Sequence, residues 1–248
     1  MDFALILASL SFILAVGWGP LLIRLLRRYG IGKRIRIDGP RGHQTKLGTP
    51  TMGGLMIVVP VFLITVALNI YNLLGRTVIG RSITVPLGVM VMYAVIGAVD
   101  DIAGVRGMRR GEGLRARQKI LWELALTFLV ALVLHFGLGL RSLAIPGVAE
   151  KIDIGFFYVP IAMFIVIGSS NAANLTDGLD GLAGVIIASC FAAYGVIAFL
   201  QGQVYLVRFC FTMVGACFAF LWYNAHPAQM FMGDTGSLAL GATLGTVA

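Results

Sequence analysis

The chain has 248 residues, of which 58% are hydrophobic and 12% are charged, and its formal net charge at pH 7 is +8. A mean hydropathy of +0.92 excludes a soluble domain of this size, because a bilayer-spanning helix needs about 20 apolar residues and the sequence supplies several such runs. The positive charge is expected to face the cytoplasm and anionic lipid. No nucleic-acid partner is expected, since no basic tract with interleaved aromatic residues lies outside the apolar runs.

Uncharged apolar runs divide the chain into eight segments. The first seven are long enough to span a bilayer, whereas the eighth has only 14 residues. We therefore predict an all-α, polytopic integral membrane helix bundle with seven full spans and a truncated eighth. It would form a single transmembrane domain over residues 1–248 that is incomplete at its C-terminal end. The runs are 3–23, 47–75, 82–99, 124–140, 154–176, 181–207, 209–233 and 235–248.

Basic residues alternate between the two sides of this bundle. The connections 24–46 and 100–119 carry eight and six Lys or Arg residues, whereas the alternate connections carry five in total. Because Lys and Arg collect on the cytoplasmic side, we expect the N-terminus outside and the first, third, fifth and seventh spans to end at the cytoplasmic face. The outer connection 141–155 is expected to be rich in turns and to hold a short strand pair.

This topology gathers polar side chains at one membrane surface, including five of the eleven acidic residues. Adjacent carboxylates at the edge of a hydrocarbon layer are costly to keep ionised, so Asp100-Asp101 indicates a metal, phosphate or proton site. A solvated pair at a helix end is the alternative. We predict one polar site on this face, and its residues are Lys46, Asp100, Asp101, Asn174, Asp177, Asp180, Asn224 and Asp234.

Three polar segments supply the chemistry. In 169–181, two Asn and two Asp recur at spacings of three and could share a helical face, with an ordinary Asn- and Asp-rich turn as the alternative. In 224–237, Asp234 opens an apolar run and could be its N-cap, while Phe231 could pack in the core or stack on a base. In 43–54, glycine backbone N–H groups and the cation of Lys46 suit a phosphate, although Lys46 could be an ordinary cytoplasmic flank.

Together these groups predict Mg²⁺-dependent phosphoryl transfer. Carboxylates hold Mg²⁺, which usually bridges to substrate phosphates and neutralises their charge. A site at the membrane surface suits a lipid-borne phosphate as one substrate.

The motifs resemble those of the polyprenyl-phosphate N-acetylhexosamine-1-phosphate transferases. They are Asp100-Asp101, Asn174-Leu-Thr-Asp-Gly-Leu-Asp-Gly181 and Asn224-x-x-Pro-Ala-x-x-Phe-Met-Gly-Asp-x-Gly-Ser237. A further pair of motifs, Asp38-Gly-Pro and His43-x-x-Lys-x-Gly-Thr-Pro-Thr-Met-Gly-Gly54, is similar to the phospho-N-acetylmuramoyl-pentapeptide transferase branch of that family. The resemblance implies ten spans, often in a homodimer, in the bacterial plasma (inner) membrane.

The implied reaction transfers phospho-MurNAc-pentapeptide from UDP-MurNAc-pentapeptide to undecaprenyl phosphate. It gives lipid I and UMP in peptidoglycan synthesis. The alternative within the family is a GlcNAc-1-phosphate transferase, against which the segment 49–54 argues. A transporter is the alternative outside the family. Transporters keep charged residues near the bilayer midplane, whereas the acidic groups here lie at the ends of spans, apart from Glu123 at the start of the fourth.

By position in the motifs, the resemblance also assigns single residues. Asp100, Asp101 and Asp234 are implied as catalytic carboxylates, and Asp234 and Asp177 as Mg²⁺ ligands. Asp100 would act as base while the lipid phosphate attacks directly, with a covalent phosphoryl-enzyme as the alternative. Phe231 would stack on uracil. The implied nucleotide-sugar pocket is Lys46, Asn174, Asp177, Gly178, Leu179, Asp180, Asn224, Phe231 and Gly233.

The chain departs from this family in two places. Gly104 stands where the family often has a lysine, and Arg106 or the Arg109-Arg110 pair is a candidate for the missing cation. The histidine-rich motif of the family is expected beyond the last residue, Ala248.

Overall fold

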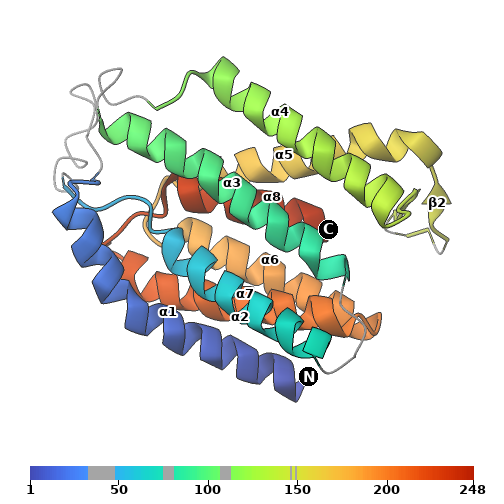
Figure 1. Ribbon diagram of the computed structural model, residues 1–248, viewed down its shortest axis with the longest axis horizontal. Helices are drawn as coiled ribbons and strands as arrows, with labels where there is room; N and C mark the ends of the chain where they lie inside the picture. The colour runs from blue at the N-terminus through green and yellow to red at the C-terminus, as the bar shows by residue number, and fades with distance from the viewer. Residues whose placement is uncertain (33–47, 75–80, 107–112, 146, 149) are drawn as a thin grey trace.

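The structure is a computed structural model that describes residues 1–32, 48–74, 81–106, 113–145, 147–148 and 150–248. Within these ranges the chain folds mainly into α-helices that lie side by side in an elongated bundle (Figure 1). The helices are α1 (Asp2–Arg28), α2 (Leu55–Leu74), α3 (Arg81–Val105), α4 (Ala116–Leu132), α5 (Tyr158–Thr176), α6 (Leu182–Leu200), α7 (Val204–Asn224) and α8 (Gly233–Val247).

Six of the described helical segments are long and apolar enough to cross a membrane. They correspond to α1, α3, α4 with its π-helical extension Val133–Gly137, α5 with the 3₁₀ turn Gly155–Phe157, α6 and α7. The prediction of an all-α, polytopic membrane bundle is confirmed at this level. The seventh full span, which the sequence places at α2, stays a prediction.

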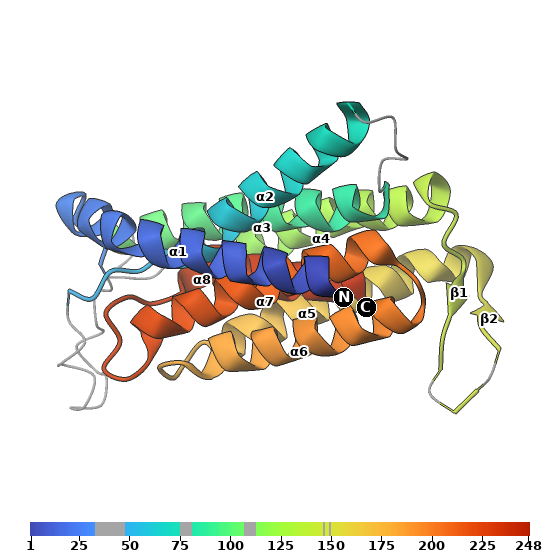
Figure 2. The same ribbon diagram turned by 90° about the horizontal axis from the view of Figure 1, so that it is seen from below.

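Helix α8 lies in the middle of the bundle, packed between α3 and α5, while α7 packs against α1 and α6 (Figures 1 and 2). Small residues make this close packing possible. A Cβ added to Gly97 of α3 would lie 2.1 Å from the backbone oxygen of Asp234, and one on Gly241 of α8 would lie 2.4 Å from the backbone oxygen of Ser169. The contact between Gly97 and Asp234 lies in the first turn of α8, so α3 and α8 are in close contact where α8 begins.

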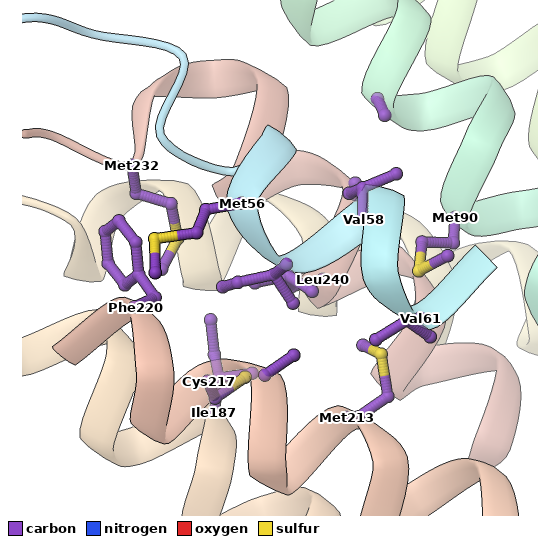
Figure 3. Packing of buried hydrophobic residues seen from close by; sticks show 14 of the residues in the cluster. Met56, Val58, Val61, Met90, Ile187, Met213, Cys217, Phe220, Met232 and Leu240 are labelled. Carbon is purple, nitrogen blue, oxygen red and sulfur yellow. The ribbon is translucent and has the colours of Figure 1, made fainter. Parts of the chain in front are cut away.

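The apolar core is rich in methionine, whose side chain is flexible. Met56 and Val61 of α2, Met213 and Phe220 of α7 and Leu240 of α8 belong to one buried cluster (Figure 3). Methionine fills irregular gaps between helices of different tilt. The outer surface is also apolar, with large exposed side chains along most helices, as expected for a surface that faces lipid.

The two ends of the bundle differ. At one end, strands β1 (Ser142–Leu143) and β2 (Ile152–Asp153) pair antiparallel, which confirms the short strand pair predicted in the 141–155 connection. The last turns of α3, α5 and α7 and the first turns of α4 and α8 all lie at the other end (Figure 1). The structure thus gathers at one end the described members of the polar set that the alternating topology placed together, from Asp100 to Asp234.

Helix boundaries differ from the uncharged runs in an informative way. Helix α4 begins at Ala116 rather than near residue 124, so Lys119 and Glu123 lie inside it. The run 181–207 is broken at Gln201–Gln203, and Arg208 lies within α7. A charge can sit in a membrane helix when it faces a partner in the protein, and the absence of charge therefore marks a span only approximately.

Candidate functional site

The candidate site lies where α8 begins. Its side chains come from the end of α3, the beginning of α4, the end of α5 and the first turn of α8. They are Asp100, Asp101, Lys119, Asn174 and Asp234, and all are at least partly shielded from solvent.

Asp101 caps the amino end of α8. Its Oδ1 accepts a hydrogen bond from the backbone N–H of Asp234 at 3.2 Å. Its Oδ2 accepts from the backbone N–H and the hydroxyl of Thr235 at 2.9 and 2.6 Å, and the Thr51 hydroxyl donates a longer bond of 3.4 Å to Oδ1. A carboxylate here satisfies helix N–H groups and complements the helix dipole. The cap that the sequence suggested for Asp234 is therefore supplied by Asp101.

Gly233 makes room for this cap. Its φ is +71°, and a Cβ added there would lie 2.5 Å from Asp101 Oδ2 and 2.6 Å from Thr51 Oγ1. A glycine is needed for both reasons, since other residues rarely adopt this conformation and a side chain would displace the carboxylate.

Asp234 is held by two donors from other helices. Lys119 Nζ donates to its Oδ2 at 2.5 Å, and Asn174 Nδ2 donates to its Oδ1 at 2.8 Å. Asn174 also donates to the hydroxyl of Ser237 at 2.9 Å. The Lys119 and Asp234 side chains keep only 17% and 23% of their surface exposed, so their attraction is weakly screened.

Asp100 lies beside this ion pair. Its Oδ1 accepts a hydrogen bond from the backbone N–H of Leu114 at 2.7 Å. The Asp100 carboxylate also interacts with the Asp234 carboxylate and with the Lys119 ammonium. Two carboxylates and one ammonium in close range form an environment that a phosphate or a cation would reorganise. The two neighbouring aspartates thus differ: Asp101 is committed to α8, and Asp100 faces the ion pair.

The donor set fits a hard cation only in part. No group of three or more His, Cys, Asp or Glu side chains that could hold a metal occurs among the described residues. Mg²⁺ usually takes one or two protein carboxylates and fills its shell with water and substrate phosphates, so Asp100 and Asp234 fit that mode. Asp177, predicted as a second ligand, lies at the C-cap of α5, and its metal role stays a prediction.

The turn between α5 and α6 borders the site. It carries Asp177 and Asp180, which follow α5 instead of continuing its helical face, together with Gly178 and Leu179. The Leu179 side chain is 66% exposed. Asp180 pairs through Oδ2 with Nδ1 of His226 at 3.0 Å, which ties this turn to the loop that precedes α8.

Asn224 lies behind the turn. It is only 3% exposed. Its Oδ1 accepts from the backbone N–H of Gly181 and its Nδ2 donates to the Met230 carbonyl, both at 2.8 Å. Both ends of the Asn224 amide therefore join two backbone segments and hold them in position relative to each other. The predicted direct contact of Asn224 with substrate stays a prediction.

The segment before α2 pairs with the loop before α8. Gly53 and Gly54 donate their backbone N–H groups to the carbonyls of Phe231 and Met232 at 2.8 and 2.9 Å, and Phe231 donates to the Pro50 carbonyl at 2.8 Å. The expectation that these two glycine N–H groups serve a phosphate is therefore wrong. The pairing fixes the backbone of Phe231, whose side chain is partly exposed.

Some predicted residues lie outside the described ranges. They are Lys46, Asp38, His43, Arg109 and Arg110. Their predicted roles are unchanged by the structure.

Lys119 belongs to the candidate site but is not among the site residues predicted from the sequence. It was counted among the cytoplasmic loop charges, yet it contacts Asp234, whereas Arg106, a candidate for the missing cation, is exposed at the end of α3. Glu123, one turn after Lys119, is 0% exposed and accepts a hydrogen bond from Asn171. The spacing of four between a lysine and a glutamate directly before an apolar run was the available signal.

Comparison with known proteins identifies similar sequences over almost the whole chain. The sequence profile of glycosyl transferase family 4 matches residues 83–248. The phospho-N-acetylmuramoyl-pentapeptide-transferase of Chloroflexus aurantiacus (strain J-10-fl) is 49% identical over 253 residues, which cover 99% of this chain and 67% of that protein. Proteins of the same name from Geobacillus sp. (strain WCH70) and Bacillus licheniformis are 44% and 38% identical, and each match covers 96% of this chain and 72% of the relative.

Proposed function

We propose that this chain, which belongs to glycosyl transferase family 4, transfers phospho-N-acetylmuramoyl-pentapeptide from UDP-MurNAc-pentapeptide to undecaprenyl phosphate. The reaction yields lipid I and UMP for peptidoglycan synthesis. Identity of 38–49% to phospho-N-acetylmuramoyl-pentapeptide-transferases supports this substrate class. The observation that carries the chemistry is the cluster of Asp100, Lys119 and Asp234 at the amino end of a buried helix.

In this mechanism an oxygen of the lipid phosphate attacks the β-phosphorus of the nucleotide sugar. The bond from that phosphorus to the bridging oxygen breaks, and UMP leaves with the bridging oxygen. Asp100 orients the attacking phosphate and accepts its remaining proton, if one is present. Because a phosphate is largely ionised near neutral pH, positioning contributes more than base strength, which favours direct attack over a covalent phosphoryl-enzyme.

Lys119 supplies the positive charge for this step. Its ammonium already lies 2.5 Å from Asp234 in a shielded site, where a cation stabilises developing phosphate charge more strongly than in water. It fills the role for which the family often has a lysine at the position of Gly104. Asp101 acts indirectly, because its hydrogen bonds hold the first turn of α8 and therefore the backbone of Asp234.

A Mg²⁺ ion would bind Asp234, with Asp100 and Asp177 as the nearby candidate ligands. When bound it would neutralise pyrophosphate charge and align the two phosphates. The side chains of the described residues alone provide too few ligands for a closed site, so substrate oxygens and water would complete the shell.

The nucleotide-sugar pocket would extend over the turn from Asp177 to Asp180 and toward Phe231. Lys46, which lies outside the described residues, is proposed from its sequence motif as a further contact to the substrate. Phe231 would offer its ring to uracil, since its backbone is fixed by pairing with Pro50 and Gly53. Asn224 and Gly233 would also shape this pocket from behind, because the Asn224 amide joins two backbone segments and Gly233 packs closely against Asp101.

The topology proposed for this enzyme has seven full spans, including α2, with α8 entering the membrane as an eighth. The site would face the cytoplasm of a bacterium and the N-terminus would lie outside, because basic residues are concentrated in the connections at the site end. A homodimer is the expected assembly.

The test uses protein purified in lipid, undecaprenyl phosphate and each of two nucleotide sugars. We expect UMP release and a lipid-linked product with UDP-MurNAc-pentapeptide and none with UDP-GlcNAc. Turnover of UDP-GlcNAc alone would replace the proposed substrate with the simpler sugar, and solute transport without UMP release would reject a transferase.

A further inference from the structure

Glu123 is an acidic side chain buried inside a membrane-spanning helix. It is 0% exposed. Its Oε2 accepts a hydrogen bond from Asn171 Nδ2 at 2.7 Å, and its backbone carbonyl accepts one from the Thr127 hydroxyl at 2.6 Å. Its Oε1 is buried and has no hydrogen-bond partner among the residues that the structure describes. A buried acceptor without a partner is destabilising, and an ionisable side chain inside a span is costly. Such a residue is therefore a candidate for a functional role.

The surroundings of Glu123 repeat those of Asp234. On α5, Asn171 donates to Glu123 and Asn174, three residues later, donates to Asp234. Residues three apart on a helix lie on one face, so α5 presents two amides to two carboxylates. Lys119 interacts with both of these carboxylates and with Asp100, but its hydrogen bond goes to Asp234.

We propose that Glu123 is a positioning residue for Lys119. When substrate phosphates and their cation engage Asp234, the Lys119 ammonium loses its hydrogen-bond partner. The unpartnered Oε1 of Glu123, one helical turn away, then holds the ammonium within the site and directed at the phosphates. This inference rests on the proposed function and extends it to a residue that touches neither substrate.

Two simpler roles for Glu123 make different predictions. If it acted only through its charge, its removal would strengthen binding of an anionic nucleotide, because a nearby negative charge would be gone. If it only joined α4 to α5 through Asn171, its removal would lower thermal stability without a specific link to Lys119. A positioning role predicts weaker nucleotide binding that depends on Lys119 being present.

The experiment measures the dissociation constant of UDP-MurNAc-pentapeptide with Mg²⁺ by calorimetry. We expect E123Q to bind about tenfold more weakly than the parent protein, the size of one charge-assisted contact. In a K119M background, E123Q should cause no further loss, since coupled residues are not additive. Two controls accompany it: E150Q makes the same change of charge in the exposed outer connection, and T127V removes the hydroxyl from the next turn of α4.

The outcomes separate the inference from the function on which it rests. Unchanged or tighter binding by E123Q, or a tenfold loss that persists in K119M, would overturn the role of Glu123 alone. Failure of the parent protein to bind the nucleotide sugar would overturn both. If E123Q proves less stable than T127V, the test is repeated with E123D, which keeps the charge but shortens the side chain. Parent-like affinity in E123D would also contradict a positioning role, because the shorter side chain would not reach the ammonium.

Discussion

The cap that Asp101 places on α8 leads to a quantitative prediction for Asp101→Asn. Asparagine has one acceptor oxygen, whereas the Asp101 carboxylate receives bonds on both oxygens, from Asp234 N–H on Oδ1 and from Thr235 N–H and Oγ1 on Oδ2. The amide NH₂ would therefore face at least one of these donors. The substitution also removes the negative charge at the positive end of the helix.

The size of this effect follows from its parts. Loss of an N-cap costs about 1 kcal/mol, loss of the charge at the helix end about 0.5–1 kcal/mol, and a buried donor without an acceptor about 1–3 kcal/mol. Because these contributions overlap, we expect a loss of about 3 kcal/mol. For a chain of this length that corresponds to a fall in melting temperature of roughly 6–12 °C.

The assay is thermal unfolding of the purified protein in detergent, with Asp100→Asn as the matched control. That control makes the same change one residue earlier, and its remaining oxygen can still accept from Leu114 N–H. Its melting temperature should stay within about 2 °C of the parent. A D101N protein as stable as the parent but without activity would refute the structural role and return Asp101 to the reacting groups.

Three other outcomes follow from the same contacts. Lys119→Met should lower turnover at least about 100-fold and weaken nucleotide-sugar affinity about tenfold, because the ammonium would contact phosphate in both ground and transition states; parent-like affinity in a calorimetric titration would show that Lys119 serves only Asp234. Gly97→Ala should lower the free energy of unfolding by about 1–3 kcal/mol, and the melting temperature with it, because the new Cβ would lie 2.1 Å from the Asp234 backbone oxygen. An unchanged melting curve would contradict the close approach of α3 and α8. Chelation of divalent cations should abolish UMP release and addition of Mg²⁺ should restore it, and full activity in excess chelator would reject the metal.

The bundle and the location of its site were predictable from the sequence. Apolar runs of membrane-spanning length and an uneven distribution of Lys and Arg were enough to place Asp100, Asn174 and Asp234 at one end. The structure brings these three residues together at the start of α8. Such patterns are readable because hydrophobicity and charge determine the topology of each span largely independently of its partners.

The contacts within the site were harder to predict. Lys119 was counted with the charges of the connection 100–119, because the uncharged run begins only after Glu123, yet partners on α8 and α5 allow both residues to lie inside α4. The cap of α8 comes from Asp101, which is distant in sequence, whereas the local rule offered Asp234 as one possible cap. Interactions between helices decide such roles, and a single sequence contains no direct record of them.

Glycines show the same division between local and distant causes. The glycine-rich entry to α2 suggested backbone N–H groups open to a phosphate. Instead, Gly53 and Gly54 allow close pairing with the carbonyls of Phe231 and Met232. These two glycines therefore serve the pairing of two backbone segments, not the phosphate site that was expected.

In the proposed mechanism, Asp100 orients the attacking lipid phosphate beside the Lys119–Asp234 pair. The most direct test of this role is the rate of lipid I formation by Asp100→Asn at saturating UDP-MurNAc-pentapeptide, measured together with the affinity for that nucleotide sugar. We predict that turnover falls at least about 100-fold while the dissociation constant changes less than about threefold. Turnover close to that of the parent protein would contradict the proposed role of Asp100.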